Sequence, residues 1–329
     1  MQQITIVGLG LIGGSIGLAL KRWSAANGNA LKIVGFDTDI NHQTLAKKMN
    51  AVDDTAWGLP DAISEADVVI LATPVGAMKQ LFEDIEPHLK FNAIVTDTGS
   101  TKTDVLEWAK LLPAHVSFVG GHPMAGKSES LEAATADLFD GATWVVCPSP
   151  TANEDAIKNV LGLIAAANGD PYFADPSEHD AYVAGISHLP FVVAAALVKT
   201  TTTDQAWRDM KSLASTGFRD TTRLALGSPE MHRDIAVTNR AALGGWIDSM
   251  ITTLQDFREQ LIGEDEGEVR ERIGEFFKEA QDLRASAEHV RPRAAEMEPE
   301  EDKVNSGGVM RSMFLGGFGR KRDEKSGRR

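Results

Sequence analysis

The sequence is poor in cysteine and in positive charge, and each shortage disfavours a class of protein. A single cysteine, Cys147, cannot form an internal disulfide. It lies in the apolar run Thr143-Trp-Val-Val-Cys147, which indicates a buried core thiol rather than a nucleophile. Lysine and arginine number 33 against 47 acidic residues, which gives a formal net charge of −14 at pH 7. Because nothing obvious would neutralise phosphates, a nucleic-acid partner is not expected, and an anionic small molecule would need a local basic pocket.

The sequence also lacks a long uninterrupted apolar run. Its longest candidate, residues 183–198, is interrupted by Ser187, His188 and Pro190. The chain begins almost directly with a predicted strand, which leaves no room for a signal peptide. We therefore expect a cytoplasmic protein without a membrane partner.

The length of 329 residues suggests about two domains, since a single hydrophobic core usually stops growing at roughly 250–300 residues. Residues 1–176 alternate strand-like and helix-like segments, which predicts an α/β Rossmann-like domain with a mostly parallel sheet. Residues 177–290 predict an all-α domain for substrate binding and dimerisation, with single helices over 203–215 and 230–261 among others. Residues 291–329 contain paired glycines and a basic end, which predicts a flexible tail.

The most informative motif is the run Ile4-Thr-Ile-Val-Gly-Leu-Gly-Leu-Ile-Gly13, a β-forming stretch that leads into three glycines. This G-x-G-x-x-G spacing is typical of dinucleotide binding. The first glycine permits a tight turn, the second lets the backbone approach a pyrophosphate, and the third lets the following helix pack on the strand. The positive end of that helix attracts the anion. The predicted cofactor-binding residues of this loop are Gly8, Gly10, Leu11, Ile12 and Gly13.

A second predicted strand, residues 32–36, leads into Asp37, which lies 24 residues after Gly13. A carboxylate about 20 residues after the motif accepts the hydrogen bond of a ribose 2′-hydroxyl and would repel a 2′-phosphate. No Arg or Lys follows within several residues, so the pattern favours NAD over NADP. The apolar run that begins at Asp67 ends in Ala72, Thr73 and Pro74. These three should border the cofactor, because the crevice of such a sheet lies beyond the carboxyl ends of its strands.

Two reactive side chains, Ser100 and His122, stand at the ends of later predicted strands. A hydrogen bond between them would fix the imidazole tautomer and leave the other ring nitrogen as a base. The alternative is that His122 caps a turn before Pro123. Five further histidines lie in helix ends or polar loops, where no catalytic role is expected: His42, His88, His115, His179 and His289.

A predicted loop between two helices carries Arg219 and Arg223. A guanidinium can hold a carboxylate through two parallel hydrogen bonds, so this loop is the predicted anion pocket. The alternative is that Asp220, Glu230 and Asp234 pair with these arginines. No metal site is predicted.

Five motifs occur in an order that is more specific than any one of them. They are Gly8-Leu-Gly-Leu-Ile-Gly13-Gly-Ser, Asp97-Thr-Gly-Ser-Thr-Lys102, Gly121-His-Pro-Met-Ala-Gly126, Ser187-His-Leu-Pro190 and Phe218-Arg-Asp-Thr-Thr-Arg223. In this set the sequence resembles the prephenate and arogenate dehydrogenases of tyrosine biosynthesis, over about residues 1–260. The resemblance implies a Rossmann domain followed by a helical dimerisation domain, a homodimer, and NAD-dependent oxidative decarboxylation of a cyclohexadienol.

The resemblance also implies individual roles. His122 would take the proton of the C4 hydroxyl while hydride leaves C4 for the nicotinamide, Ser100 would orient His122, and Arg223 would bind the substrate carboxylate. The other predicted substrate-binding residues are Arg219, Ser128, His188 and His232. Ser128 stands where some relatives place a glutamate, His232 where a tryptophan is common, and Phe191 where some have a polar residue. These departures leave the choice between prephenate and arogenate open.

Two other functions fit parts of the pattern. A β-hydroxyacid-type dehydrogenase would share the two-domain plan, but such enzymes rely on a lysine, and the helix around Ser187 offers none until Lys199. A non-catalytic, dinucleotide-sensing binding protein would not require Ser100, His122 and Arg223 together.

Overall fold

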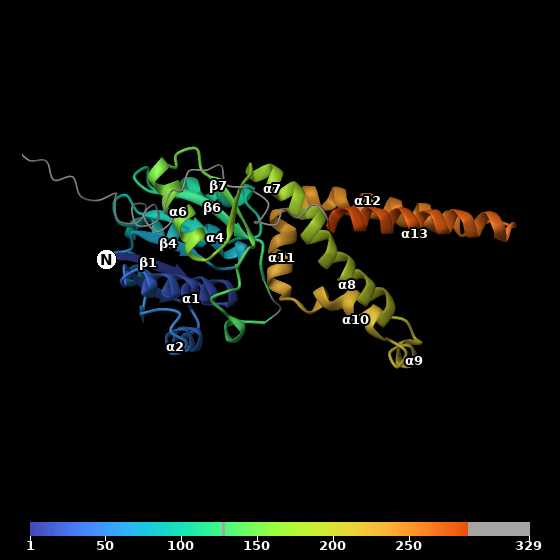
Figure 1. Cartoon of the computed structure of the whole chain (residues 1–329), viewed down its shortest axis with the longest axis horizontal. Coiled ribbons are helices and arrows are strands. Elements are labelled where there is room, and N and C mark those ends of the chain that lie inside the picture. The colour runs from blue at the N-terminus through green and yellow to red at the C-terminus, as the bar shows by residue number, and fades with distance from the viewer. Residues whose placement is uncertain (127–128, 289–329) are drawn as a thin grey trace, which may run out of the picture. The chain divides into compact units, whose positions relative to one another are not determined.

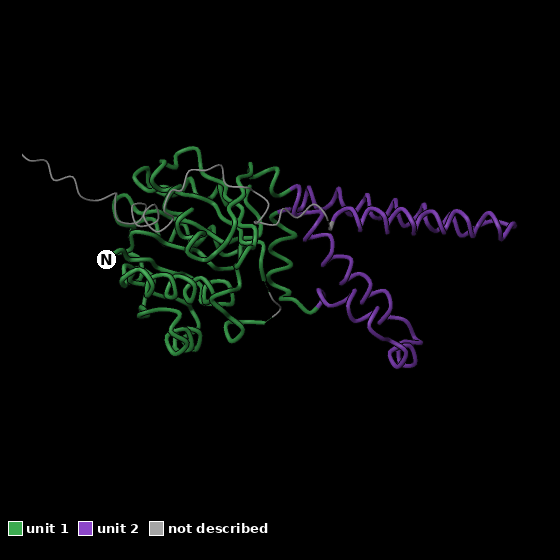
Figure 2. Tube along the Cα trace, viewed as in Figure 1, with its two compact units in different colours: residues 1–180, 226–238, 304–329 green, residues 181–225, 239–303 purple. Residues whose placement is uncertain are grey.

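The computed structural model describes residues 1–126 and 129–288, which group into two compact units (Figures 1 and 2). Unit 1 comprises the described residues of 1–180 together with 226–238. Unit 2 comprises residues 181–225 and the described residues from 239 onward. Ser128, His289 and the predicted tail lie outside the described residues. Each unit combines separate stretches of the chain that pack together, so the units do not test the predicted domain limits at residues 176 and 290.

Unit 1 is built on one eight-stranded sheet with the strand order β3-β2-β1-β4-β5-β6-β7-β8. The strands are β1 (Gln2–Val7), β2 (Leu31–Phe36), β3 (Asp54–Thr55), β4 (Val68–Leu71), β5 (Ile94–Asp97), β6 (Ser117–Pro123), β7 (Thr143–Pro148) and β8 (Asp170–Phe173). All neighbouring strands run parallel except β6 and β7. The prediction of a mostly parallel Rossmann-like sheet is therefore confirmed.

The helices of unit 1 include those that cover the two faces of this sheet. They are α1 (Leu11–Ala26), α2 (Ile40–Lys48), α3 (Leu59–Ile63), α4 (Met78–Ile85), α5 (Thr103–Trp108), α6 (Glu154–Ala166), most of α7 (Pro176–Val183) and α11 (Pro229–Thr238). Successive side chains of β1 point to opposite faces of the sheet. Ile4 and Ile6 join the core cluster that α1 and α6 complete, whereas Thr5 donates a hydrogen bond to the carbonyl of Ala62 in α3. On the α3 side, Phe82 of α4 packs edge-to-face on Phe118 of β6.

Unit 2 is helical, as predicted. It contains a π-helical turn η5 (Ala184–His188), α8 (Leu189–Thr202), α9 (Trp207–Met210), α10 (Thr216–Thr222), α12 (Arg240–Gln260) and α13 (Glu266–Glu288). The rings of Phe257 and Phe276 lie 4.8 Å apart between α12 and α13. This aromatic contact packs the last two described helices together.

Three local predictions in the helical half were wrong. The single helix expected over 230–261 is interrupted at Asn239, whose backbone is non-helical and whose side-chain amide donates to Nδ1 of His188. The helix expected over 203–215 shortens to α9, because the Asp204 carboxylate accepts from the Ala206 N–H and competes with helix formation. The segment with Arg219 and Arg223 is helical rather than a loop: Arg219 lies in α10, and Arg223 begins the 3₁₀ turn η6 (Arg223–Leu226).

The polar residues at 187, 188 and 190 do not end the helix in which they lie. A continuous helical run, Pro176–Thr202, is long and apolar enough by length and composition to cross a membrane. A third of its most apolar window is buried (33%). Core helices of soluble proteins pass the same test, so this helix by itself assigns no membrane location.

Candidate active site

The glycine loop after β1 has the geometry that its spacing predicts. Gly8 has φ +96°, and a Cβ at this position would lie 2.5 Å from the carbonyl oxygen of Ala72. A Cβ on Gly13 would lie 1.9 Å from the carbonyl oxygen of Gly8, so these two glycines are required by close packing. A Cβ on Gly10 would meet nothing within 4 Å. The space beside Gly10 at the start of α1 is therefore open, as close approach of a pyrophosphate requires.

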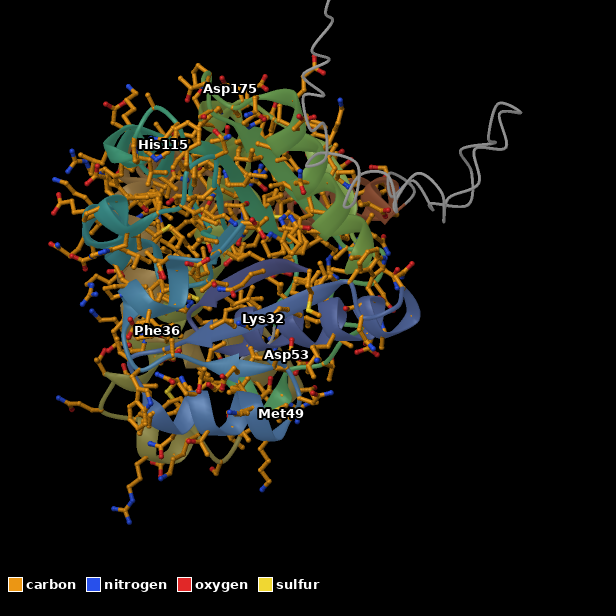
Figure 3. All side chains as sticks on the ribbon, turned by 90° about the vertical axis from the view of Figure 1, so that its left-hand side faces the viewer. Lys32, Phe36, Met49, Asp53, His115 and Asp175 are labelled. Carbon is orange, nitrogen blue, oxygen red and sulfur yellow. The ribbon has the colours of Figure 1, made fainter. Side chains whose placement is uncertain are left out.

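A cleft of about 670 Å³ opens beside this loop, within the size range of small-molecule sites. Its lining residues are Val7, Gly8, Gly10, Phe36, Asp37, Thr38, His42, Leu59, Ala72, Thr73, Pro74, Ala77, Gln80, Leu81 and Asp84. In Figure 3, Phe36 marks the carboxyl end of β2 and Lys32 its opposite end. Six predicted cofactor-binding residues thus share one cleft, whereas Leu11, Ile12 and Gly13 form the start of α1. A cofactor contact of those three stays a prediction.

Asp37 lines this cleft at the carboxyl end of β2. Its carboxylate accepts hydrogen bonds from the backbone N–H of Leu9 at 2.7 Å and of Asp39 at 2.8 Å, which ties the glycine loop to the end of β2. Nδ1 of His42 lies 3.5 Å from the same carboxylate. His42 therefore lines the cleft, which was not predicted from the sequence. The residues that line the cleft include neither lysine nor arginine. A carboxylate with no lysine or arginine beside it can accept a ribose hydroxyl and repels a 2′-phosphate, so the chain fits NAD better than NADP.

His122 is buried within β6 and pairs with Val145 of β7. Its Nδ1 lies 2.8 Å from Nε2 of His179 in α7, and Nδ1 of His179 lies 2.8 Å from Oδ1 of Asp180. His179 and Asp180 are themselves buried. His179 lies in the first turn of α7, as expected of a histidine in a helix end, but its side chain is buried and in contact with His122, which was not expected. The sequence signal for it was only an adjacent acid, which does not reveal a partner 57 residues away.

Asp180 also anchors the first turn of α5. Its carboxylate accepts hydrogen bonds from the backbone N–H of Lys102 at 2.8 Å and of Thr103 at 2.9 Å. Burial by itself raises the pKa of the Asp180 carboxyl, but the hydrogen bonds from His179, Thr103 and Lys102 outweigh burial and hold this pKa below its ordinary value. Asp180 is therefore an anion at neutral pH, and His179 must donate to it.

A fully buried ion pair, Asp97 with Lys102, holds the backbone on both sides of this site. The Asp97 carboxylate accepts from the N–H of Gly99 at 2.8 Å and from the N–H of Gly121 at 3.0 Å. These glycines directly precede Ser100 and His122, so one carboxylate positions the backbone of both predicted catalytic residues. The hydrogen bond from Ser100 to His122 stays a prediction, since the contact that the structure gives to Nδ1 comes from His179.

The remaining predicted substrate-binding residues that the structure describes come from segments after residue 180 of the chain. Arg219 pairs with the neighbouring Asp220 at 3.1 Å, so the alternative of a neutralised arginine is realised there. Arg223 forms no ion pair within the part of the chain that the structure describes. His188 is buried in unit 2, where it accepts from Asn239 at 3.2 Å. His232 belongs to α11 of unit 1, and burial lowers the pKa of its imidazole.

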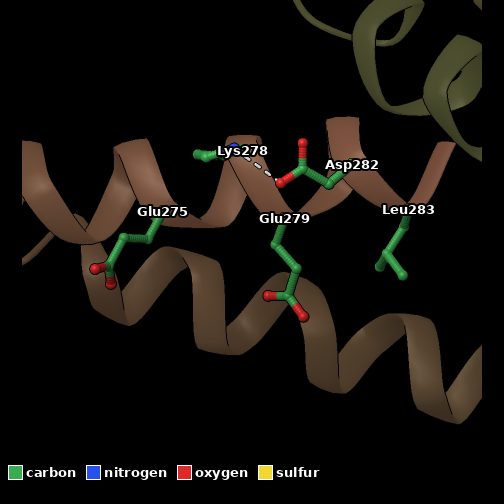
Figure 4. Close-up of a pocket in the computed structure, with 5 residues that line it drawn as sticks. All are labelled: Glu275, Lys278, Glu279, Asp282 and Leu283. Carbon is green, nitrogen blue, oxygen red and sulfur yellow. Dashed lines mark hydrogen bonds and ion pairs between the residues drawn. The ribbon is translucent and has the colours of Figure 1, made fainter. Parts of the chain in front are cut away.

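A second hollow, about 440 Å³, lies along α13 and is lined by Glu275, Lys278, Glu279, Asp282 and Leu283 (Figure 4). Lys278 pairs with Asp282 at 2.8 Å, and the lining contains none of the predicted site residues. A hollow lined by one exposed helix has no donor loop for a phosphate and does not compete with the cleft of unit 1.

Comparison with known proteins agrees with this geometry. The sequence matches the nucleotide-binding domain of prephenate dehydrogenases over residues 16–172 and their dimerization domain over residues 175–285. It is 35% identical over 287 residues to a prephenate dehydrogenase of Bacillus subtilis, covering 86% of this chain and 75% of that one. It is 30% identical to a cyclohexadienyl dehydrogenase of Zymomonas mobilis, covering 86% and 95%.

Among solved structures, the fold is similar to a prephenate dehydrogenase from A. aeolicus in complex with hydroxyphenyl propionate and NAD+. The TM-score is 0.78 at 29% identity, over 87% of this chain and 98% of that one. The cofactor of the present chain is NAD, in agreement with the Asp37 side of its cleft. By its sequence and its fold, the chain belongs to the prephenate dehydrogenase family and is an NAD-dependent oxidoreductase.

Proposed function

We propose that this enzyme catalyses the oxidative decarboxylation of prephenate to 4-hydroxyphenylpyruvate, or of arogenate to tyrosine, in tyrosine biosynthesis. The observation that carries the proposal is the placement of His122. It is buried on β6, its Nδ1 is engaged by His179, and Asp97 ties its backbone to the segment that holds Ser100. A base on β6 and a hydroxyl in the loop that follows the neighbouring strand β5 suit a substrate that must lose a hydroxyl proton.

NAD, when bound, accepts the hydride from C4 of the ring. His122 takes the proton of the C4 hydroxyl, so that C4 becomes a carbonyl carbon as hydride departs. The ring carboxylate then leaves as CO2, its bonding electrons pass through the ring to the C4 oxygen, and that oxygen recovers the proton from His122. The ring becomes aromatic, which makes the step practically irreversible. The protein itself needs to supply a base, orientation and anion binding.

Ser100 orients the C4 hydroxyl beside His122, and Arg223 binds a substrate carboxylate. Arg223 suits that role because no acid neutralises it among the described residues, whereas Arg219 is held by Asp220. Arg219, Ser128, His188 and His232 complete the set of substrate-binding residues that we propose. The choice between the keto group of prephenate and the ammonium of arogenate depends on groups beside the substrate side chain, among them His232, whose imidazole pKa is lowered by burial.

We also propose a cytoplasmic homodimer that forms through unit 2. The match to a dimerization domain over residues 175–285 supports it, together with apolar side chains that are more than half exposed in a single chain. Examples are Leu254, Phe277 and Leu283. Burial of such side chains against a second copy would stabilise the pair. Sedimentation equilibrium should give twice the chain mass of 35.4 kDa, and a monomer at micromolar concentration would contradict the proposal.

The reaction is tested by NADH formation at 340 nm, with prephenate and arogenate offered separately and with NAD and NADP each tried. Activity with NAD and at least one of the two substrates is expected. In the same assay Arg223→Ala should chiefly raise KM for the substrate, while Arg219→Ala should change KM less. Folded protein that turns over none of the four combinations would refute the proposed reaction.

A further inference from the structure

A chain of hydrogen bonds runs from a buried carboxylate to the proposed base. Oδ1 of Asp180 lies 2.8 Å from Nδ1 of His179, and Nε2 of His179 lies 2.8 Å from Nδ1 of His122. All three side chains are buried, and all belong to unit 1. The contact between the two rings is edge-on, at an interplanar angle of 78°, which suits an N–H of one ring directed at the lone pair of the other.

The protonation of each nitrogen follows from the end of this chain. An ionised carboxylate can only accept, so Nδ1 of His179 carries hydrogen and donates to Asp180. In a neutral imidazole the other nitrogen is then an acceptor, so Nε2 of His179 accepts from Nδ1 of His122. Neutral His122 therefore carries its hydrogen on Nδ1 and its basic lone pair on Nε2.

We infer that His179 and Asp180 are positioning residues that fix the tautomer of His122, so that Nε2 of His122 is the base. Among the predicted residues Ser100 was expected to fix this tautomer, and the structure gives the position at Nδ1 to His179 instead. The inference deepens the proposed function and rests on it for the role of His122 in turnover.

The same chain stabilises the cation that forms when Nε2 of His122 accepts a proton. The positive charge on His122 is then stabilised through His179 by the Asp180 carboxylate, which the N–H groups of Lys102 and Thr103 hold in place. Among the residues that the structure describes, the titratable groups near His122 also include the Asp97–Lys102 pair from the β5 side and Cys147 on β7. The pair carries no net charge and burial keeps the thiol neutral, so Asp180 is the compensating charge for His122.

Imidazole nitrogen NMR tests the tautomer without substrate or NAD. In ¹⁵N-labelled protein at pH 8, we expect His122 as a single tautomer with hydrogen on Nδ1. His179→Leu should abolish this preference, whereas His179→Gln, whose amide oxygen can accept from Nδ1 of His122, should keep most of it. His115→Gln, a histidine stacked on Phe91 away from this chain of hydrogen bonds, is the matched control and should leave the His122 signals unchanged.

Kinetics test the consequence. His179→Leu should lower kcat by about 10- to 100-fold with less than a threefold change in KM for substrate or NAD, and His179→Gln should recover most of the loss. The acid limb of the pH profile of kcat/KM should move to lower pH in His179→Leu, because the His122 cation loses its compensating anion. Retained Nδ1–H tautomer and wild-type kcat in His179→Leu would overturn the inference. Absence of turnover with an intact tautomer in the wild type would refute the proposed reaction instead and leave the tautomer assignment standing.

Discussion

Replacing Lys102 with methionine should strongly destabilise unit 1, because it leaves the carboxylate of Asp97 buried without its cation. Both side chains of this pair are 0% exposed. Methionine has a similar length and no charge, so the change removes the ion pair while it keeps most of the packing.

The expected cost follows from the surroundings of Asp97. Removing one partner of a buried ion pair typically costs about 3–5 kcal/mol. Here the N–H groups of Gly99 and Gly121 still donate to the carboxylate, so we expect the lower end of that range, about 3 kcal/mol. For a domain of this size, that cost corresponds to a fall in Tm of about 6–12 °C. Adding Asp97→Asn removes both charges and keeps an acceptor, so the double variant should recover part of the loss.

The assay is thermal unfolding followed by circular dichroism, with far-UV spectra to show that each variant folds. Lys158→Met is the matched control, since Lys158 pairs with Glu154 across one turn of α6 and both side chains are at least half exposed. Its Tm should change little. A Lys102→Met variant that melts within 2 °C of the wild type, or no lower than Lys158→Met, would refute the role assigned to the buried pair.

Three further predictions concern charge and burial. The pKa of the Asp180 carboxyl is lowered in the fold, so the ionised carboxylate stabilises the folded state above pH 3.8, its ordinary pKa, and this stabilisation is lost as pH falls through the lower folded pKa. Asp180→Asn should therefore reduce the fall of Tm at acid pH. An unchanged fall of Tm would argue against this role of Asp180. Burial raises the pKa of Cys147 to about 12, so Ellman's reagent at pH 8 should react only after unfolding, and rapid reaction of native protein would contradict this. Asp37→Asn should weaken NAD binding about tenfold, in a fluorescence titration, and improve the relative binding of NADP; equal affinities before and after would remove Asp37 from the ribose site.

The elements that the sequence predicted well are those specified by local pattern. Strand β4 was visible as an uninterrupted apolar run, and the glycine spacing at Gly8, Gly10 and Gly13 predicted the turn that the φ of Gly8 now shows. These signals are local, since each depends on residues within about ten positions of one another.

The contacts that the sequence did not predict join distant segments. His179 meets His122 across 57 residues, and Asp180 reaches the N-terminus of α5 across 78. Nothing local to His179 distinguishes it from a solvated histidine. The interruption at Asn239 was likewise hidden, because the side chain of Asn239 is hydrogen-bonded to His188, which lies 51 residues earlier. Fold class therefore followed from pattern, whereas the surroundings of the proposed base required the three-dimensional arrangement.

The most direct test of the central proposal is the turnover of His122→Asn with prephenate or arogenate and NAD, measured beside its affinity for NAD. We predict a fall in kcat of about 10²–10⁴-fold with NAD affinity essentially unchanged, because the variant loses the base but keeps the cleft of unit 1. In the wild type, turnover should also fall as pH drops through the pKa of His122. An unaltered kcat in His122→Asn would contradict the assignment of His122 as the base.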